Sequence, residues 1–134
     1  MTYRSHADLG GKSGYGRVVP EPEGELFHAP WEPQALALTL AMGASGAWNL
    51  DMGRSARETL PDYARLSYYA IWIEALEKML IDRDLVGKDE VAAGHMLHPP
   101  RMVARVLRAG DVPAALAKGT PTQRMATTPA TWLT

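Results

Sequence analysis

The residues of this chain that could carry chemistry are histidines, arginines and tyrosines, because the sequence contains no cysteine. That absence excludes disulfides, thiolate metal ligands and cysteine nucleophiles from this polypeptide. His95 and His98 are spaced so that two imidazoles could face one metal ion, but no third ligand lies near them in sequence and Pro99-Pro100 follows directly. We therefore interpret them as part of a surface loop and predict that this chain holds no metal.

A second candidate motif, Gly11-Lys12-Ser13, has the residue order that ends a phosphate-binding loop. Such a loop also needs a glycine five residues before its Gly-Lys pair, and His6 stands at that position. Phosphate binding is therefore not predicted.

Aromatic residues and two arginines form a third group with chemical potential. On a helix Tyr68 and Trp72 would share one face, whereas Tyr69 would lie on another apolar face. One face would then meet the core and the other a partner or a pocket. Arg54 and Arg57 precede this group, and spacing alone classes them as ordinary surface cations. The aromatic residues concerned, which by type most often pack in a core or an interface, are Tyr63, Tyr68, Tyr69 and Trp72.

The length and the charge of the chain limit the number of domains and the classes of protein that are possible. A chain of 134 residues has room for one ordinary domain. Its formal net charge is −1 and its pI is about 6.4, so it lacks the basic surface that nucleic acids and anionic membranes require. No apolar run approaches the roughly 20 residues that span a bilayer, and no signal segment opens the sequence. We expect a cytoplasmic protein that binds neither nucleic acid nor membranes.

The elements that position these residues are predicted to be helices, which makes the fold mainly α. Leu and Ala without Val or Ile favour a helix from Trp31 to Ser45 over a strand, and Asn49 can cap the next one. A core-facing stripe is expected on the third helix, at Leu66, Tyr69, Ile73, Leu76 and Leu80. The other predicted helices cover Leu50 to Leu60, Lys88 to Gly94, Arg101 to Arg108, and Val112 to Lys118 ended by Gly119.

The chain divides into three parts by composition. Residues 1–30 are rich in Gly, Pro and Glu without a period of 2 or 3.6, so we expect an extended arm laid across a partner subunit. Residues 31–119 should form a small helical domain. Residues 120–134 have the Thr/Pro-rich composition of a tail or linker.

Four segments taken together resemble the β subunit of nitrile hydratases in order and spacing. They are the arm segment His6-Ala7-Asp8-Leu9-Gly10-Gly11 with Gly14-Tyr15-Gly16, then Leu26-Phe27-His28-Ala29-Pro30-Trp31-Glu32, Leu50-Asp51-Met52-Gly53-Arg54 and Tyr68-Tyr69-Ala70-Ile71-Trp72. The resemblance runs from about His6 to Arg124. It corresponds to the half of that subunit that precedes its small carboxy-terminal β barrel, so it implies a mainly α chain without a barrel.

This resemblance implies an enzyme subunit that is inactive alone. Members of the family hydrate a nitrile to an amide at a low-spin Co(III), or alternatively Fe(III), held by a Cys-x-x-Cys-Ser-Cys motif of the α subunit. Two of those cysteines are oxidised, and arginines of the β subunit hydrogen-bond their oxygens. By position the first of these arginines is Arg54, and a planar guanidinium suits such an anion.

The resemblance also implies a substrate pocket lined by Leu50, Tyr68 and Trp72, with the Tyr68 hydroxyl near the metal centre. Gly53 departs from many relatives, which carry a bulky aromatic residue there. We therefore expect a wider pocket and a bulky, heteroaromatic nitrile as substrate.

Several alternatives stay open at this point. Some family members, of the toyocamycin nitrile hydratase type, are split into three chains, and a third small barrel subunit would then carry the second arginine. A nitrile hydratase accessory or maturation protein, a thiocyanate hydrolase subunit and a helical interaction module are the competing interpretations.

Overall fold

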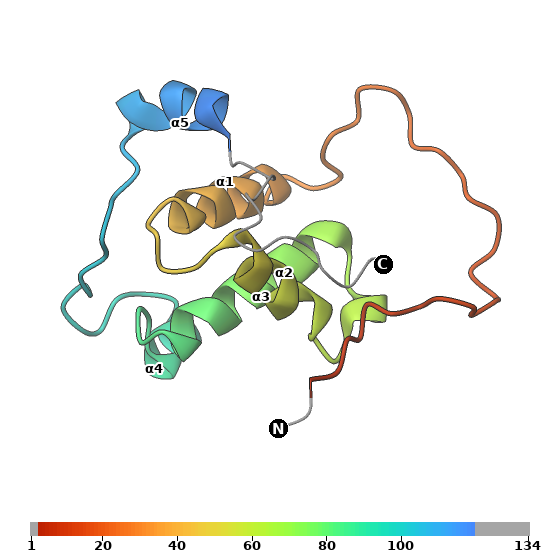
Figure 1. The fold of residues 1–134 in the computed structure, drawn as a ribbon, viewed down its shortest axis with the longest axis horizontal. Coiled ribbons are helices and arrows are strands. Elements are labelled where there is room, and N and C mark those ends of the chain that lie inside the picture. Colours follow the sequence, from red (N-terminus) through yellow and green to blue (C-terminus); the bar gives the residue numbers. More distant parts are fainter. Residues whose placement is uncertain (1–2, 120–134) are drawn as a thin grey trace, which may run out of the picture.

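The computed structural model describes residues 3–119, and it is helical (Figure 1). Within this range the chain forms five α-helices and two single-turn 3₁₀ helices, η1 and η2, and no strand. The mainly α fold predicted from the sequence is confirmed. The elements are α1 (Glu32–Gly43), α2 (Leu50–Glu58), η1 (Tyr63–Arg65), α3 (Tyr68–Asp82), α4 (Lys88–Ala93), η2 (Ala109–Asp111) and α5 (Val112–Lys118).

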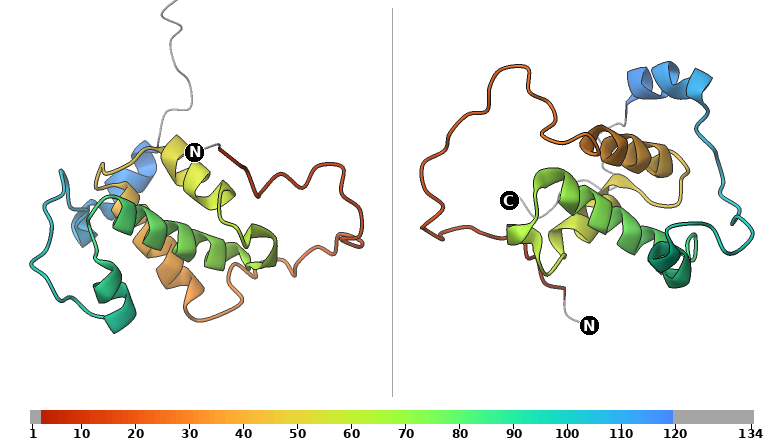
Figure 2. Two further views of the ribbon diagram at one scale, coloured as in Figure 1. Left: turned by 90° about the horizontal axis from the view of Figure 1, so that it is seen from below. Right: turned by 180° about the vertical axis from the view of Figure 1, so that it is seen from behind.

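The longest helix, α3, is the centre of the fold, and α1 and α2 both pack against it (Figures 1 and 2). Small side chains allow the close approach, since Ala35 of α1 and Ala75 of α3 are each only 1% exposed. The main buried cluster joins α2 to α3 and consists of Ala56, Leu60, Ile71, Ala75 and Met79. This core holds α2 at a fixed position on α3.

Helix α2 has a clear start and a clear end. The Asn49 side chain accepts a hydrogen bond from the Met52 backbone N–H at 2.9 Å, which satisfies one of the free donors of the first turn. At the other end the Thr59 hydroxyl donates to the Ser55 carbonyl at 2.7 Å. The helix predicted from Leu50 to Leu60 with an Asn49 cap is therefore confirmed, except that it ends at Glu58.

Helix α3 differs from the sequence prediction in its start and in its buried face. It begins at Tyr68, after extended backbone at Leu66 and Ser67. Its buried residues are Ile71, Ala75, Leu76 and Met79. The predicted stripe Leu66, Tyr69, Ile73, Leu76 and Leu80 is therefore correct only in part: Leu76 is buried and the other four are half-buried, although Leu66 packs against the main buried cluster. The small Ala75 and the flexible Met79 fill the core side instead.

The helix predicted from Arg101 to Arg108 is wrong, because residues 101–108 contain no helix. Met102 and Val106 are 93% and 69% exposed, so a helix there would bury no apolar face, and short helices without packing are marginal in water. The predicted short helices on either side are confirmed as α4 and α5. Each ends at a glycine with positive φ, Gly94 at 70° and Gly119 at 59°.

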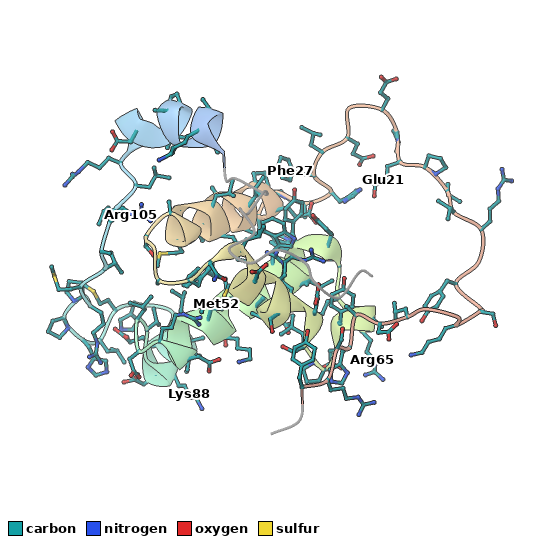
Figure 3. The ribbon with its side chains drawn as sticks, viewed as in Figure 1. Glu21, Phe27, Met52, Arg65, Lys88 and Arg105 are labelled. Carbon is teal, nitrogen blue, oxygen red and sulfur yellow. The ribbon has the colours of Figure 1, made fainter. Side chains whose placement is uncertain are left out.

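Residues 3–31 contain neither helix nor strand and run in a wide loop beside the helices (Figure 1). The loop is attached near its start, where the His6 and Ala7 N–H groups donate to the Glu58 carbonyl at 2.7 and 3.1 Å. It is attached again near its end, where the Phe27 ring lies 5.3 Å from that of Tyr69 (Figure 3). That this arm lies across a partner subunit stays a prediction, and the proposed tail at 120–134 falls outside the described residues.

None of the helices in residues 3–119 combines the length and the apolar character needed to cross a membrane.

Candidate functional site

A hollow of about 270 Å³ opens between α2 and the first turn of α3, with η1 at its edge. Four of the five site residues expected from the sequence line it: Leu50, Arg54, Tyr68 and Trp72. Its other lining residues are Arg57, Glu58, Tyr63 and Ile71. The helical period explains the gathering on α2, because residues 50, 54 and 57 follow one another at steps of four and three along one face.

Arg54 lies at this hollow with a side chain that is 65% exposed. Its Nη2 lies 3.2 Å from Oε1 of Glu58, one helical turn further on. The other carboxylate oxygen of Glu58 accepts a hydrogen bond from the Tyr3 hydroxyl at 3.4 Å. The ion pair with Glu58 orients the Arg54 side chain. Because an exposed i,i+4 ion pair is weak, little free energy is needed to break it when Arg54 binds another anion.

Arg57 also lines the hollow, and the sequence did not distinguish it from a surface cation. Its guanidinium carbon lies 4.7 Å from the centre of the Trp72 ring, a cation–π arrangement. Among residues 3–119 it has no ion pair or hydrogen bond. One signal could have indicated its place, since Arg57 stands three residues after Arg54 and therefore on the same side of α2.

The aromatic wall of the hollow is a cluster rather than a single ring. The centres of the Tyr68 and Trp72 rings are 5.7 Å apart, and those of Tyr68 and Tyr69 are 5.1 Å apart at nearly right angles. Tyr69 in turn touches Phe27 of the arm. Tyr68 is 64% exposed, and its hydroxyl makes no hydrogen bond within the described range. The edge of this wall therefore offers a free donor to whatever occupies the hollow.

Gly53, the fifth expected site residue, is not part of the hollow. It is buried on the face of α2 that also carries Ala56, toward the core. A Cβ atom there would lie 3.9 Å from Cδ1 of Trp48, which is ordinary van der Waals contact. A side chain at this position would point toward Trp48 rather than into the hollow, and neither Gly53 nor Trp48 lines the hollow.

The two histidines near α4 are held separately from each other. Nε2 of His98 lies 2.7 Å from the Asp89 carboxylate, and Nδ1 of His95 lies 2.9 Å from the Ala93 carbonyl oxygen. The hydrogen bond from His98 lowers the pKa of Asp89. No group of three or more potential metal ligands exists among residues 3–119. Lys12 and its neighbours lie in the exposed part of the arm.

Glu90 ties the loop after α4 to the first turn of that helix. Its carboxylate accepts backbone hydrogen bonds from Gly87 at 2.8 Å, Leu97 at 2.9 Å and His98 at 3.1 Å. These three donors lower the pKa of Glu90 to about 2. The arrangement is a structural anchor for residues 95–98.

The chemistry that the hollow offers follows from its donors. Two guanidinium groups and two tyrosine hydroxyls present N–H and O–H donors, while Leu50, Ile71 and Trp72 provide apolar surface. These groups suit an anion or a polarised group next to a ring, and not the direct ligation of a metal.

A family model and the most similar relatives that we compared all point to the same family. Residues 3–125 match the family model of the nitrile hydratase β subunit, N-terminal part. The chain is 38% identical over 86 residues to the low-molecular weight cobalt-containing nitrile hydratase subunit β of Rhodococcus rhodochrous, which covers 63% of this chain and 38% of that protein. It is 34% identical over 89 residues to the nitrile hydratase subunit β of Pseudomonas putida, covering 65% of this chain and 41% of the relative.

The chain thus spans about two fifths of the length of these relatives. The matched family model covers nearly all of it. The chain therefore belongs to the nitrile hydratase β subunit family and represents its N-terminal part.

Proposed function

We propose that this chain is the non-metal-binding subunit of a nitrile hydratase, which hydrates a nitrile to the amide in complex with an α subunit carrying a Cys-x-x-Cys-Ser-Cys motif. The observation that carries the proposal is the gathering of Leu50, Arg54, Tyr68 and Trp72 around one hollow. The Rhodococcus rhodochrous relative is named as cobalt-containing, which favours Co(III) over Fe(III) in the partner.

The metal, held by the α subunit, would act as a Lewis acid toward the nitrile or a bound water. The contribution of this chain is to hold charge and substrate in place. Arg54 would donate hydrogen bonds to the oxygens of the oxidised cysteines, since a guanidinium offers several fixed donors and keeps its charge. Its weak pairing with Glu58 costs little to break.

Leu50, Tyr68 and Trp72 would form the substrate wall. Their mixture of apolar surface and one free hydroxyl suits a nitrile attached to a ring, which the aromatic side chains would contact by stacking. The proposed substrate is a bulky, heteroaromatic nitrile, because Gly53 places no side chain between α2 and Trp48. Comparing rates on propionitrile and on a cyano-substituted purine tests the size preference, and equal rates would contradict it.

The arm supports an obligate assembly. Between its two points of attachment the arm exposes apolar side chains: Tyr15 is 63%, Val18 is 87% and Val19 is 80% exposed. Exposed apolar surface of this kind marks sites of contact with another protein. These residues would contact the α subunit. A third, small barrel subunit is the other partner that we propose.

The decisive experiment is co-expression of this chain with the α chain and a barrel chain. We expect a complex of fixed stoichiometry that forms amide from nitrile, and no amide when this chain is left out. An active enzyme that lacks this chain would refute the proposal and favour a maturation protein. Turnover of thiocyanate in place of nitriles would favour a thiocyanate hydrolase.

A further inference from the structure

We infer that Arg57 is a specificity-determining residue, which binds a negatively charged group on the nitrile substrate, such as a carboxylate attached to an aromatic ring. This inference rests on the proposed function and concerns the same hollow.

The first observation is that Arg57 is positioned before any ligand arrives. Its side chain is half-buried, and its guanidinium carbon lies 4.7 Å from the centre of the Trp72 ring. Because a cation is attracted to an aromatic face, this contact limits the conformations of a long and otherwise flexible side chain. Arg57 is therefore held at the wall of the hollow.

The second observation is that its donors are unused. Arg54 pairs with Glu58, Arg65 pairs with Asp62, and Arg83 donates to the Ala47 carbonyl. Arg57 has no such partner in residues 3–119, although it is less exposed than Arg54 or Arg65. A half-buried guanidinium with free N–H groups favours an acceptor that carries negative charge.

The third observation is the charge of the hollow. Its lining contains two arginines and one glutamate, so two positive charges and one negative charge leave a formal charge of +1. Glu58 already accepts hydrogen bonds from Arg54 and Tyr3. The unbalanced positive charge therefore belongs to Arg57.

The apolar lining indicates that the anion belongs to the substrate rather than to the partner subunit. Leu50, Trp72 and Ile71 surround the same space and would contact a ring. A ring held between these side chains would share the hollow with Arg57, which could then bind a negatively charged substituent on that ring.

The test uses the assembled complex and two substrates of nearly equal size, 4-cyanobenzoate and the uncharged 4-cyanobenzamide. We expect the wild-type complex to prefer the anion in kcat/KM. Arg57→Gln should reduce the ratio of kcat/KM for the anion to that for the neutral nitrile by about 10- to 100-fold, the range that a charge-assisted hydrogen bond provides. The change should appear mainly in KM. Arg57→Lys should lose less, because it keeps the charge.

Arg65→Gln is the matched control, since Arg65 is 86% exposed and lies outside the lining of the hollow (Figure 3). It should leave the ratio unchanged. If Arg57→Gln lowers kcat/KM for both nitriles equally, or weakens co-purification with the α subunit, Arg57 contacts the partner and the inference is overturned. A wild-type complex that hydrates no nitrile at all, the cyano-substituted purine and propionitrile included, would refute the proposed function itself. A wild-type complex that hydrates nitriles but shows no preference for the anion would overturn only the inference about Arg57.

Discussion

Replacing Arg54 should greatly reduce the activity of the assembled enzyme but hardly change the stability of this chain, because the side chain of Arg54 makes only a weak contact within the chain. Its one ion pair within residues 3–119, with Glu58 at 3.2 Å, joins side chains that are 65% and 31% exposed. An i,i+4 pair of this kind stabilises a helix by about 0.3 to 0.5 kcal/mol. Arg54→Ala should therefore lower the thermal unfolding midpoint of this chain by only about 1 to 4 °C.

The same change should strongly affect the assembled enzyme. If Arg54 donates two charge-assisted hydrogen bonds to the oxidised sulfurs, each contributes about 1.5 to 3 kcal/mol. Their combined loss corresponds to a decrease in kcat of roughly 10²- to 10⁴-fold. Arg54→Lys retains the charge and the pair with Glu58 but offers no planar fork, so we expect an intermediate decrease.

Amide formation by the purified complex, measured with equal metal content in each variant, provides the comparison. Arg65→Ala serves as the control, because its pair with Asp62 is 3.9 Å long and highly exposed. Wild-type kcat in Arg54→Ala would show that this guanidinium does not act at the centre. A large drop in thermal stability with no separate effect on turnover would show that its role is structural.

Three further predictions concern the scaffold. Asn49→Ala removes the cap of α2 and should cost about 1 kcal/mol in the free energy of unfolding, measured by urea denaturation, whereas Asn49→Asp should cost much less. Met79→Ala should cost about 2 to 5 kcal/mol in the same assay, because this side chain is only 2% exposed, and a smaller loss would show that the core closes around it. The pKa of Glu90 is lowered to about 2 from an ordinary value of 4.5, so its stabilising effect is complete above pH 4.5 and is lost as the pH falls through 2. The backbone amides of Leu97 and His98 should accordingly keep their protection from hydrogen exchange at pH 4.5 and lose it near pH 2, and Glu90→Gln should weaken it at pH 7.

The sequence predicted those elements whose ends carry local signals. Asn49 marks the start of α2 by its side-chain hydrogen bond, and Gly94 and Gly119 mark the ends of α4 and α5 by their positive φ. These signals act over a few residues, so they are visible without knowledge of the tertiary fold. Because α2 was placed well, the side of it that carries Leu50 and Arg54 could also be anticipated.

Features that depend on packing between helices were not predictable in the same way. Helix α3 is apolar on more than one face, and the choice of Ala75 and Met79 for the core depends on the small side chains of α1 and α2. The role of Arg57 likewise depends on Trp72, which stands fifteen residues later and on another helix. Gly53 was expected at the pocket but faces Trp48, since a residue next to Arg54 points in a different direction on a helix.

The two attachments of the arm have a geometric consequence. Its start is fixed to Glu58 and its end to Tyr69, and these residues belong to the two helices between which the hollow opens. Residues 8–26 therefore form a loop of fixed chain length between these two attachments. The first attachment, at Glu58, lies next to Arg54, and the second, at Tyr69, lies next to Trp72. A partner segment that lies against the arm would therefore be positioned relative to Arg54 and Arg57 by these two attachments and by the length of chain between them. Deleting a few residues at Val18 would change that position and leave the sequence of the helices unchanged.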